Sequence, residues 1–197
     1  TTTGSGLSSF NLDDDADGHI DDVRGWDFVN EDSDPMDGNG HGTHVAGTIA
    51  AVGDNRLGIV GVAPQARIMA LKGLSDQGSG AVSGLAAGIR YAAIHGADVL
   101  NNSWGGFGAQ EVIDDAVAYA HARGVVVLAA AGNDNSRVEG GFFPANHPKV
   151  ISISAFNQHD EKAVFSNWGE KIDVAAPGGG EGDDRSDGSP LWNILSL

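Results

Sequence analysis

Two histidines in a glycine-rich stretch are the side chains best suited to chemistry. His41 and His44 lie in the segment NGHGTHVAGTIAA, which spans Asn39–Ala51. Glycines at 38, 40 and 42 allow a sharp turn into a helix whose first turn carries His41. An accessible imidazole there titrates near neutrality and can act as a general base. A metal pair with His44 and a helix-capping or packed histidine are the alternatives, although H-x-x-H lacks the glutamate of H-E-x-x-H.

A second chemical pattern is acidic. The segment NLDDDADGHIDD contains D-x-D-x-D-G, formed by Asp13, Asp15, Asp17 and Gly18. Alternating carboxylates with glycine at the sixth position can wrap a hard cation such as Ca²⁺, with the backbone oxygen of His19 at the seventh. The twelfth position is Arg24, so this is no standard EF-hand, and the shell would need further carboxylates, Asp21 or Asp22. A solvated acidic loop is the alternative.

The elements that would position these groups alternate along the chain. Residues 11–40 are polar and indicate an ordered loop, and a helix begins near His41. Apolar spacing predicts helices over 82–93 and 111–123, each stopped by a glycine in a left-handed cap, Gly96 and Gly124. Strands are expected at 67–72, 98–103, 125–131 and 150–155, where apolar and β-branched residues gather.

Alternation of strands and helices predicts the fold class. We expect an α/β fold with three layers, a mostly parallel sheet flanked by helices on both faces. Functional groups should then lie at the carboxyl ends of the strands. The 197 residues fit one domain.

Composition narrows the classes of partner. The chain has 27 acidic and 11 basic side chains, a formal charge of −16. Such a charge disfavours nucleic acid and anionic membrane surfaces, and the longest apolar run, 125–131, is too short to span a bilayer. No cysteine is present, which excludes thiolate zinc sites and cysteine catalysis.

Six further segments accompany the histidine segment in a fixed order. They are GVAP at 61–64, NNSWGG at 101–106, AAAGN at 129–133, FFPA at 142–145, FSNWG at 165–169 and DVAAPG at 173–178. Together with HGTHVAGT they resemble the subtilisin-like serine proteases, over about Trp26–Gly178. The resemblance implies that His41 is the catalytic base of a serine endopeptidase.

The same resemblance assigns residues to the binding of substrate. Asn133 corresponds to the family's oxyanion-hole asparagine, whose amide donates to the tetrahedral intermediate. Substrate would bind as an added strand along an edge formed by Ser103, Trp104 and Gly105. Ala131 and Gly132 would form the facing wall of the substrate pocket. Ser103 lacks a G-x-S-x-G context and is expected to contact substrate rather than attack it. Phe143–Pro144 matches a position where the family has a cis peptide.

A second calcium loop is implied by resemblance only. The segment from Trp26 to Gly40 is similar to a loop of heat-stable subtilases that precedes the histidine motif. Carried over by position, the ligands would be Asp27, Asn30, Asp32, Asp34 and the oxygen of Met36. Asn30 replaces an acidic residue and should weaken the site. Calcium as the cofactor suits a secreted, extracellular enzyme.

Two motifs of the family are not found. No D-[ST]-G strand precedes the histidine segment, and no G-T-S-M-A helix follows DVAAPG. We therefore expect a single partial peptidase domain over 1–197, incomplete at both ends. Its parts are an acidic calcium-loop region over 1–40, a core over 41–178, and a loop and truncated end over 179–197.

This interpretation predicts how the chain behaves. It should be inactive unaided, acting on protein or peptide substrates only with a complementary chain that carries the aspartate and serine segments. The alternative is a protease-like chain that holds peptides without cutting them. Loss of a central strand would leave unpaired edges and exposed apolar surface, hence marginal stability or association.

Overall fold

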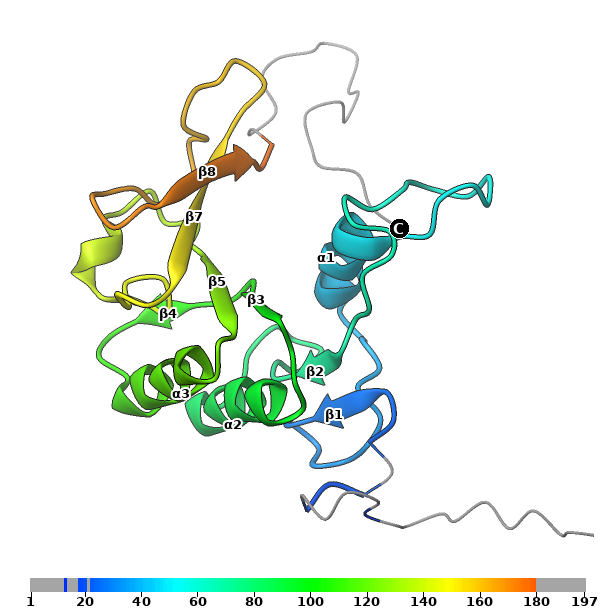
Figure 1. Ribbon diagram of the computed structural model, residues 1–197. Coiled ribbons are helices and arrows are strands. Elements are labelled where there is room, and N and C mark those ends of the chain that lie inside the picture. Colours follow the sequence, from blue (N-terminus) through cyan, green and yellow to red (C-terminus); the bar gives the residue numbers. More distant parts are fainter. Residues whose placement is uncertain (1–12, 14–17, 21, 180–197) are drawn as a thin grey trace, which may run out of the picture.

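The computed structural model describes residues 13, 18–20 and 22–179 (Figure 1). Within that part of the chain, no helix combines the length and apolar character needed to cross a membrane. The elements, in chain order, are β1 Gly25–Asp27, α1 His41–Ala50, β2 Ala70–Lys72, α2 Val82–Ile94, β3 Val99–Asn102, β4 Gly106–Phe107, α3 Glu111–Ala122, β5 Val126–Ala130, the 3₁₀ helix η1 Val138–Gly140, β6 Phe142–Phe143, β7 Ile151–Phe156 and β8 Val174–Pro177.

The three expected helices and the four expected strands are all present. The glycine stops are confirmed as well, because Gly96 and Gly124 have φ of 75° and 84°. Strand β1 was missed, since it lies in the polar region that we expected to be loop. Strands β4, β6 and β8 were also missed: β4 and β6 have two residues each, too few to show a period.

The strands form three separate sheets. The largest has the order β3-β5-β7-β8 and is parallel throughout. Strands β1 and β2 form a second parallel sheet, and β4 pairs with β6 in an antiparallel ribbon. The mostly parallel α/β fold expected from the sequence is confirmed.

One face of the largest sheet is covered by two helices. Helices α2 and α3 pack side by side against it (Figure 1). Ile89 of α2 and Ile113 and Val117 of α3 are buried in the same cluster as Val127 and Ala129 of β5. This layer is the hydrophobic core, and it fixes the strands whose carboxyl ends carry the candidate site.

The other face of the same sheet carries exposed apolar side chains. Val99, Val126, Ile151 and Val174 lie on it, because paired residues and residues two apart in one strand share a face. They are 54%, 43%, 36% and 49% exposed. Parallel sheets are normally covered on both faces. The sequence interpretation predicted exposed apolar surface, and this uncovered face of the sheet is such a surface.

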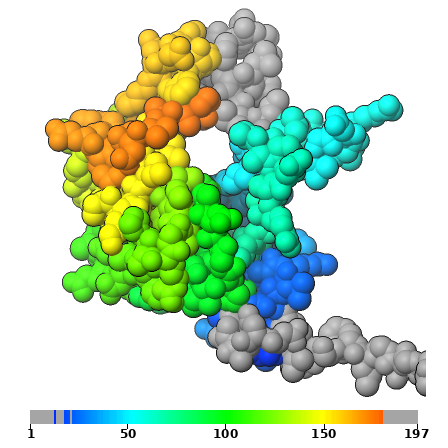
Figure 2. Space-filling model, in the orientation of Figure 1, coloured from blue at the N-terminus to red at the C-terminus, as the bar shows by residue number. Residues whose placement is uncertain are grey.

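The expected unpaired strand edges are also present. Helix α2 connects β2 to β3, yet the two strands belong to different sheets. Among the described residues, the edge of β2 that faces away from β1 and the edge of β3 that faces away from β5 pair with no strand. Figure 2 shows an open gap between the segment that contains α1 and the body that contains the largest sheet.

Candidate functional site

A groove lies at the carboxyl ends of β3 and β5, where the fold class predicts function. Its volume is about 350 Å³, and it is lined by Ser103, Trp104, Gly105, Gly106, Phe107, Ala130, Gly132, Asn133, Asp134 and Phe142. The structure therefore brings Ser103, Trp104 and Gly105 together with Gly132 and Asn133, as the resemblance implied.

Ala131 is an exception among the expected wall residues. It is 1% exposed and belongs to the core cluster, and it does not line the groove. Alternating side chains of a strand point to opposite faces, so Val127, Ala129 and Ala131 point into the core. Ala130 lines the groove in its place.

Two glycines keep the groove open. At Gly132, which has φ of 105°, a Cβ atom would lie 2.4 Å from Nδ2 of Asn167. At Gly105 it would lie 2.4 Å from Cε1 of Phe142 and 2.7 Å from the carbonyl oxygen of Phe143. No side chain fits at either position, which leaves backbone groups of the groove uncovered by side chains. The Phe143–Pro144 peptide beside them is cis, as expected.

One buried asparagine fixes the loop that carries Asn133. Asn167 is fully buried. Its Oδ1 accepts from the N–H groups of Asp134 at 2.9 Å and Ser136 at 3.0 Å, and its Nδ2 donates to the carbonyl oxygen of Ala131 at 2.8 Å. Its own N–H donates to the carbonyl oxygen of Gly132 at 3.0 Å. These bonds hold the backbone on both sides of Asn133.

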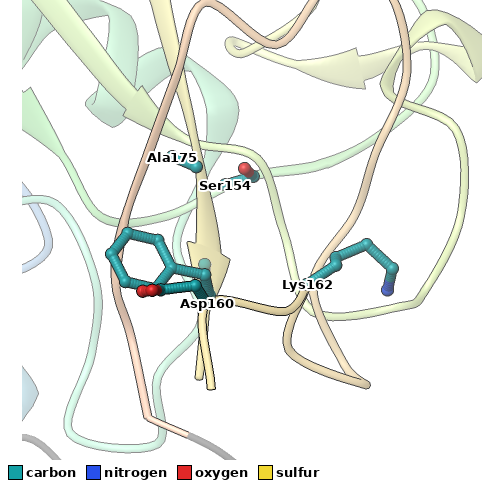
Figure 3. A pocket seen from close by; sticks show the side chains of 6 residues that line it. Ser154, Asp160, Lys162 and Ala175 are labelled. Carbon is teal, nitrogen blue, oxygen red and sulfur yellow. The ribbon is translucent and has the colours of Figure 1, made fainter. Parts of the chain in front are cut away.

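A lysine ammonium tethers the same loop. Lys162 Nζ donates to Oδ1 of Asn135 and to the carbonyl oxygens of Ala163 and Ser166, each at 3.0 Å. Figure 3 shows a hollow near the end of β7 where the Lys162 side chain extends away from Asp160. Neither Lys162 nor Asn167 was identified from the sequence, because their partners lie up to 36 residues away.

His41 lies outside this groove. It begins α1, whose only buried residue is Gly47, and it does not line the groove. The His41 side chain is exposed, and no hydrogen bond or ion pair of its imidazole occurs among the described residues. His44 is also exposed on α1. The structure thus presents the His41 imidazole to solvent without an orienting carboxylate in the described part of the chain.

Asp37 shapes the turn that presents His41. Its carboxylate accepts hydrogen bonds from the N–H and hydroxyl of Thr43, both at 2.8 Å, from Gly40 N–H at 2.8 Å and from Asn39 N–H at 2.9 Å. The hydrogen bond from Thr43 N–H, with those from Gly40 and Asn39, holds the pKa of Asp37 well below its usual range. This role of Asp37 was not predicted from the sequence, although an aspartate shortly before a helix is a recognised signal.

The first acidic loop is only partly described. Asp15, Asp17 and Asp21 lie outside the described residues. Gly18, with φ of 96°, donates its N–H to Oδ2 of Asp13 at 2.9 Å. Asp22 accepts a hydrogen bond from the Tyr91 hydroxyl, and the His19 ring packs edge-on against Trp26, with centroids 4.6 Å apart.

The second acidic loop is organised differently from a calcium site. Asp27 is fully buried; its carboxylate accepts from Val29 N–H at 2.6 Å and Asn30 N–H at 3.0 Å, and pairs with Lys72 Nζ at 3.3 Å. Burial alone would raise the pKa of Asp27, but the hydrogen bonds from Asn30 and Val29 and the Lys72 ammonium lower it overall.

The remaining expected ligands of that loop do not gather around Asp27. Asp32, Asp34 and Met36 are exposed, and Asp32 Oδ1 accepts from Asp34 N–H at 3.0 Å. Among the described residues, no three acidic or histidine side chains could hold a metal ion together. The residues as they stand do not fit a calcium ion at Asp27, because a lysine neutralises that carboxylate.

A sequence model of the subtilase family, peptidase family S8, matches residues 3–193. The chain belongs to the subtilase family. It is 48% identical to a thermophilic serine proteinase of Bacillus sp. (strain AK1) over 164 residues, which cover 83% of the chain and 40% of the relative. It is 47% identical to thermitase of Thermoactinomyces vulgaris over 156 residues, 79% of the chain and 55% of the relative.

Solved structures agree with this subtilase assignment. A cold adapted subtilisin-like serine proteinase matches with a TM-score of 0.71 at 38% identity, over 79% of the chain and 55% of that structure. Proteases from Pseudoalteromonas arctica PAMC 21717 match with a TM-score of 0.68 at 38% identity, over 72% and 44%. The subtilase chain thus spans about half the length of the relatives that it matches.

Proposed function

We propose that this subtilase chain is part of the catalytic domain of a secreted serine endopeptidase. It would contribute the general base His41 and the oxyanion donor Asn133. The observation that carries the proposal is the groove, in which Asn133 faces the edge formed by Ser103, Trp104 and Gly105. Asn133 is exposed there, and its backbone is held on both sides by Asn167.

The chemistry would follow from these two side chains. His41 would accept the proton of an attacking serine hydroxyl and return it to the leaving amine as the carbon–nitrogen bond breaks. The Asn133 amide would donate to the oxyanion of the tetrahedral intermediate, a contribution worth about 10²–10³ in turnover in another subtilase. Both steps need a nucleophile and an orienting carboxylate.

A complementary segment would supply those two groups. Support comes from the sequence, which contains neither D-[ST]-G nor G-T-S-M-A, and from the exposed imidazole of His41. The unpaired edges of β2 and β3 offer backbone groups to one further parallel strand. The apolar face around Val126 and Ile151 offers a surface for a covering helix.

A test uses the chain with and without such a segment. We expect no cleavage of a quenched fluorescent peptide by the chain alone. Activity should appear when a polypeptide carrying a D-[ST]-G strand and a G-T-S-M-A helix is added. His41→Ala should abolish that activity, and Asn133→Ala should lower kcat about 10²–10³-fold. Reconstituted activity that survives His41→Ala would refute the proposal.

A second function is peptide binding without cleavage. The observation that favours it is that the groove is formed by this chain alone. Peptide binding by the chain, together with failure of every complementary segment to restore cleavage, would support this second function over the first.

We also propose that calcium stabilises the chain through the loop around Asp13 and Gly18. The D-x-D-x-D-G pattern supports this site, whereas the pairing of Asp27 with Lys72 argues against the second loop. A ligand that binds only the folded state raises the melting temperature. The test is the melting temperature in chelator and in millimolar calcium, for the wild type and for Asp13→Asn. An equal melting temperature in both solutions would refute calcium binding.

A further inference from the structure

The turn that precedes α1 contains the asparagine–glycine pair Asn39–Gly40, and the sequence has no other such pair. Asparagine followed by glycine is the pair most prone to deamidation, because glycine has no side chain to shield its own backbone nitrogen. Both residues are exposed, and a Cβ atom at Gly40 would meet no atom of the described residues within 4 Å. Solvent water therefore reaches this pair.

Deamidation needs two groups of this pair and one molecule of water. The Gly40 nitrogen gives up its proton and bonds to Cγ of Asn39, and the side-chain nitrogen of Asn39 leaves Cγ as ammonia, which takes that proton. Water then opens the cyclic imide at either carbonyl carbon, and the product is aspartate or isoaspartate. No electron is transferred, so that the net change is the entry of water and the loss of ammonia.

Hydrogen bonds of the folded turn hold both reacting groups. The Gly40 N–H donates to Oδ1 of Asp37 at 2.8 Å, and Asn39 Nδ2 donates to the carbonyl oxygen of Asp76 at 2.8 Å. The Asp37 carboxylate is ionised at neutral pH, because the hydrogen bonds that it accepts, led by that from Thr43 N–H, hold its pKa well below its usual range. A negative charge beside the Gly40 N–H disfavours loss of that proton. The folded turn therefore opposes the reaction.

We propose that Asn39–Gly40 is a deamidation site whose rate is set by the Asp37 carboxylate, and that its modification releases turn 37–41 from segment 75–79. The Asn39 amide links this turn to that segment across 37 positions of the chain. A carboxylate at position 39 has no N–H to donate, and its oxygens would face the Asp76 carbonyl oxygen. Isoaspartate would also lengthen the main chain just before α1. This modification does not depend on whether the chain cleaves peptides.

The first test measures deamidation of the full chain by peptide mapping. The chain is incubated at mildly alkaline pH, and mass spectrometry follows the replacement of NH₂ by OH at position 39. We expect slow modification of the folded wild type and a rate about tenfold or more higher in Asp37→Ala, the factor that loss of a hydrogen bond to a charged group corresponds to. In urea, where the turn is unfolded, both chains should react at the same, faster rate.

Two control variants accompany this measurement. Asp34→Ala removes an equal charge from an exposed position of the same loop and should leave the rate unchanged. Asn39→Gln should lower the rate sharply, because the longer side chain would have to close a larger ring.

Three results would overturn the control of deamidation by Asp37. They are equal rates in folded wild type and Asp37→Ala, equal rates in folded and urea-unfolded wild type, and no modification of Asn39 in urea. The comparison of folded and unfolded wild type tests the protection even where Asp37→Ala does not fold.

A further variant tests the consequence of the modification. Asn39→Asp carries the product side chain from the start, and amide hydrogen exchange should become faster in α1 and segment 75–79 and stay unchanged in β5. Asn157→Asp is the matched control, because Asn157 Oδ1 accepts hydrogen bonds in a surface loop and an aspartate keeps both acceptor oxygens. Exchange in α1 and segment 75–79 that is as slow in Asn39→Asp as in the wild type would overturn the release of the turn.

Discussion

The two candidate catalytic residues, Asn133 and His41, lie in regions that differ in how much of their structure is buried and hydrogen-bonded. Asn133 follows β5, the strand with buried Val127 and Ala129, and its loop is fixed by Asn167 and Lys162. His41 begins α1, which buries only Gly47 and is held at its start by the Asp37 carboxylate. The region of the proposed oxyanion donor Asn133 is thus built into the core, whereas the region of His41 depends on an exposed turn.

This difference indicates which region can form by itself. The groove has its partners within the chain, since segment 162–168 holds loop 131–136. The histidine region lies across an open gap (Figure 2), next to strand edges that no described strand pairs. We infer that a complementary segment would add more order to α1 than to the groove.

The largest expected effect is at Asn167. Asn167→Ala would leave the N–H groups of Asp134 and Ser136 and the carbonyl of Ala131 without their partner. The free energy of unfolding should fall by about 3–5 kcal/mol, measured by urea denaturation. Asn157→Ala is the control, because Asn157 Oδ1 accepts from His159 N–H and Glu161 N–H in a loop at the surface. A loss at Asn157 that matches the loss at Asn167 would contradict the buried scaffold.

A second change tests the backbone of the groove. Gly132→Ala places a Cβ atom at φ of 105° and 2.4 Å from Asn167 Nδ2, which should cost about 2 kcal/mol or more. Gly140→Ala is the matched control, because its Cβ atom would meet nothing within 4 Å. Its expected change is about 0.5 kcal/mol or less. Similar unfolding free energies for both variants would show that loop 131–136 can shift to accommodate the added Cβ atom.

A third change tests the histidine side and its pH dependence. Asp37→Asn should cost about 1 kcal/mol and speed amide hydrogen exchange in α1, with little change in β5. Because the pKa of Asp37 is lowered on folding, its contribution is present above the unfolded pKa of about 3.9. It is lost as the pH falls below about 4 toward the lowered value. Equal acid sensitivity of α1 in the wild type and the variant would argue against this role.

The smallest effect is expected at the uncovered face. Val126→Thr replaces one methyl group with a hydroxyl group on a side chain that is 43% exposed. The unfolding free energy of the chain alone should therefore change by about 0.5 kcal/mol or less. The same change should weaken binding of a complementary segment if that segment covers the face. A large loss of stability in the chain alone would show that the face is already covered.

Local pattern was sufficient for much of the fold. Apolar spacing placed α2 and α3, and Gly96 and Gly124 marked their ends, because these signals lie within a few residues of one another. Strand β1 was missed because its three residues pair with β2, more than forty positions along the chain. The separation of β2 from β3 likewise depends on contacts between distant segments.

Some residues of the candidate site could be predicted from local sequence, whereas others depend on contacts between distant segments. Ser103, Trp104, Gly132 and Asn133 were assigned to one substrate-binding region by the resemblance of their segments to the subtilase family, and the structure has them lining one groove. Asn167 lies within the FSNWG motif, but the motif gives no sign of its hydrogen bonds to loop 131–136. The carboxylate of Asp27 was expected to bind calcium from the resemblance of its segment to a subtilase loop. Its actual partner, Lys72, lies too far along the chain for any local pattern to indicate the ion pair.

The Lys162 ammonium has a consequence for how the groove responds to its surroundings. Surrounded by oxygens of Asn135, Ala163 and Ser166, it is a cation that is covalently attached to its own site. Such an ion cannot be diluted, exchanged or removed by a chelator, since its local concentration is fixed by the side chain. The groove should therefore keep its shape in low-salt and chelating media, in which a site that depended on a free bound ion would lose that ion.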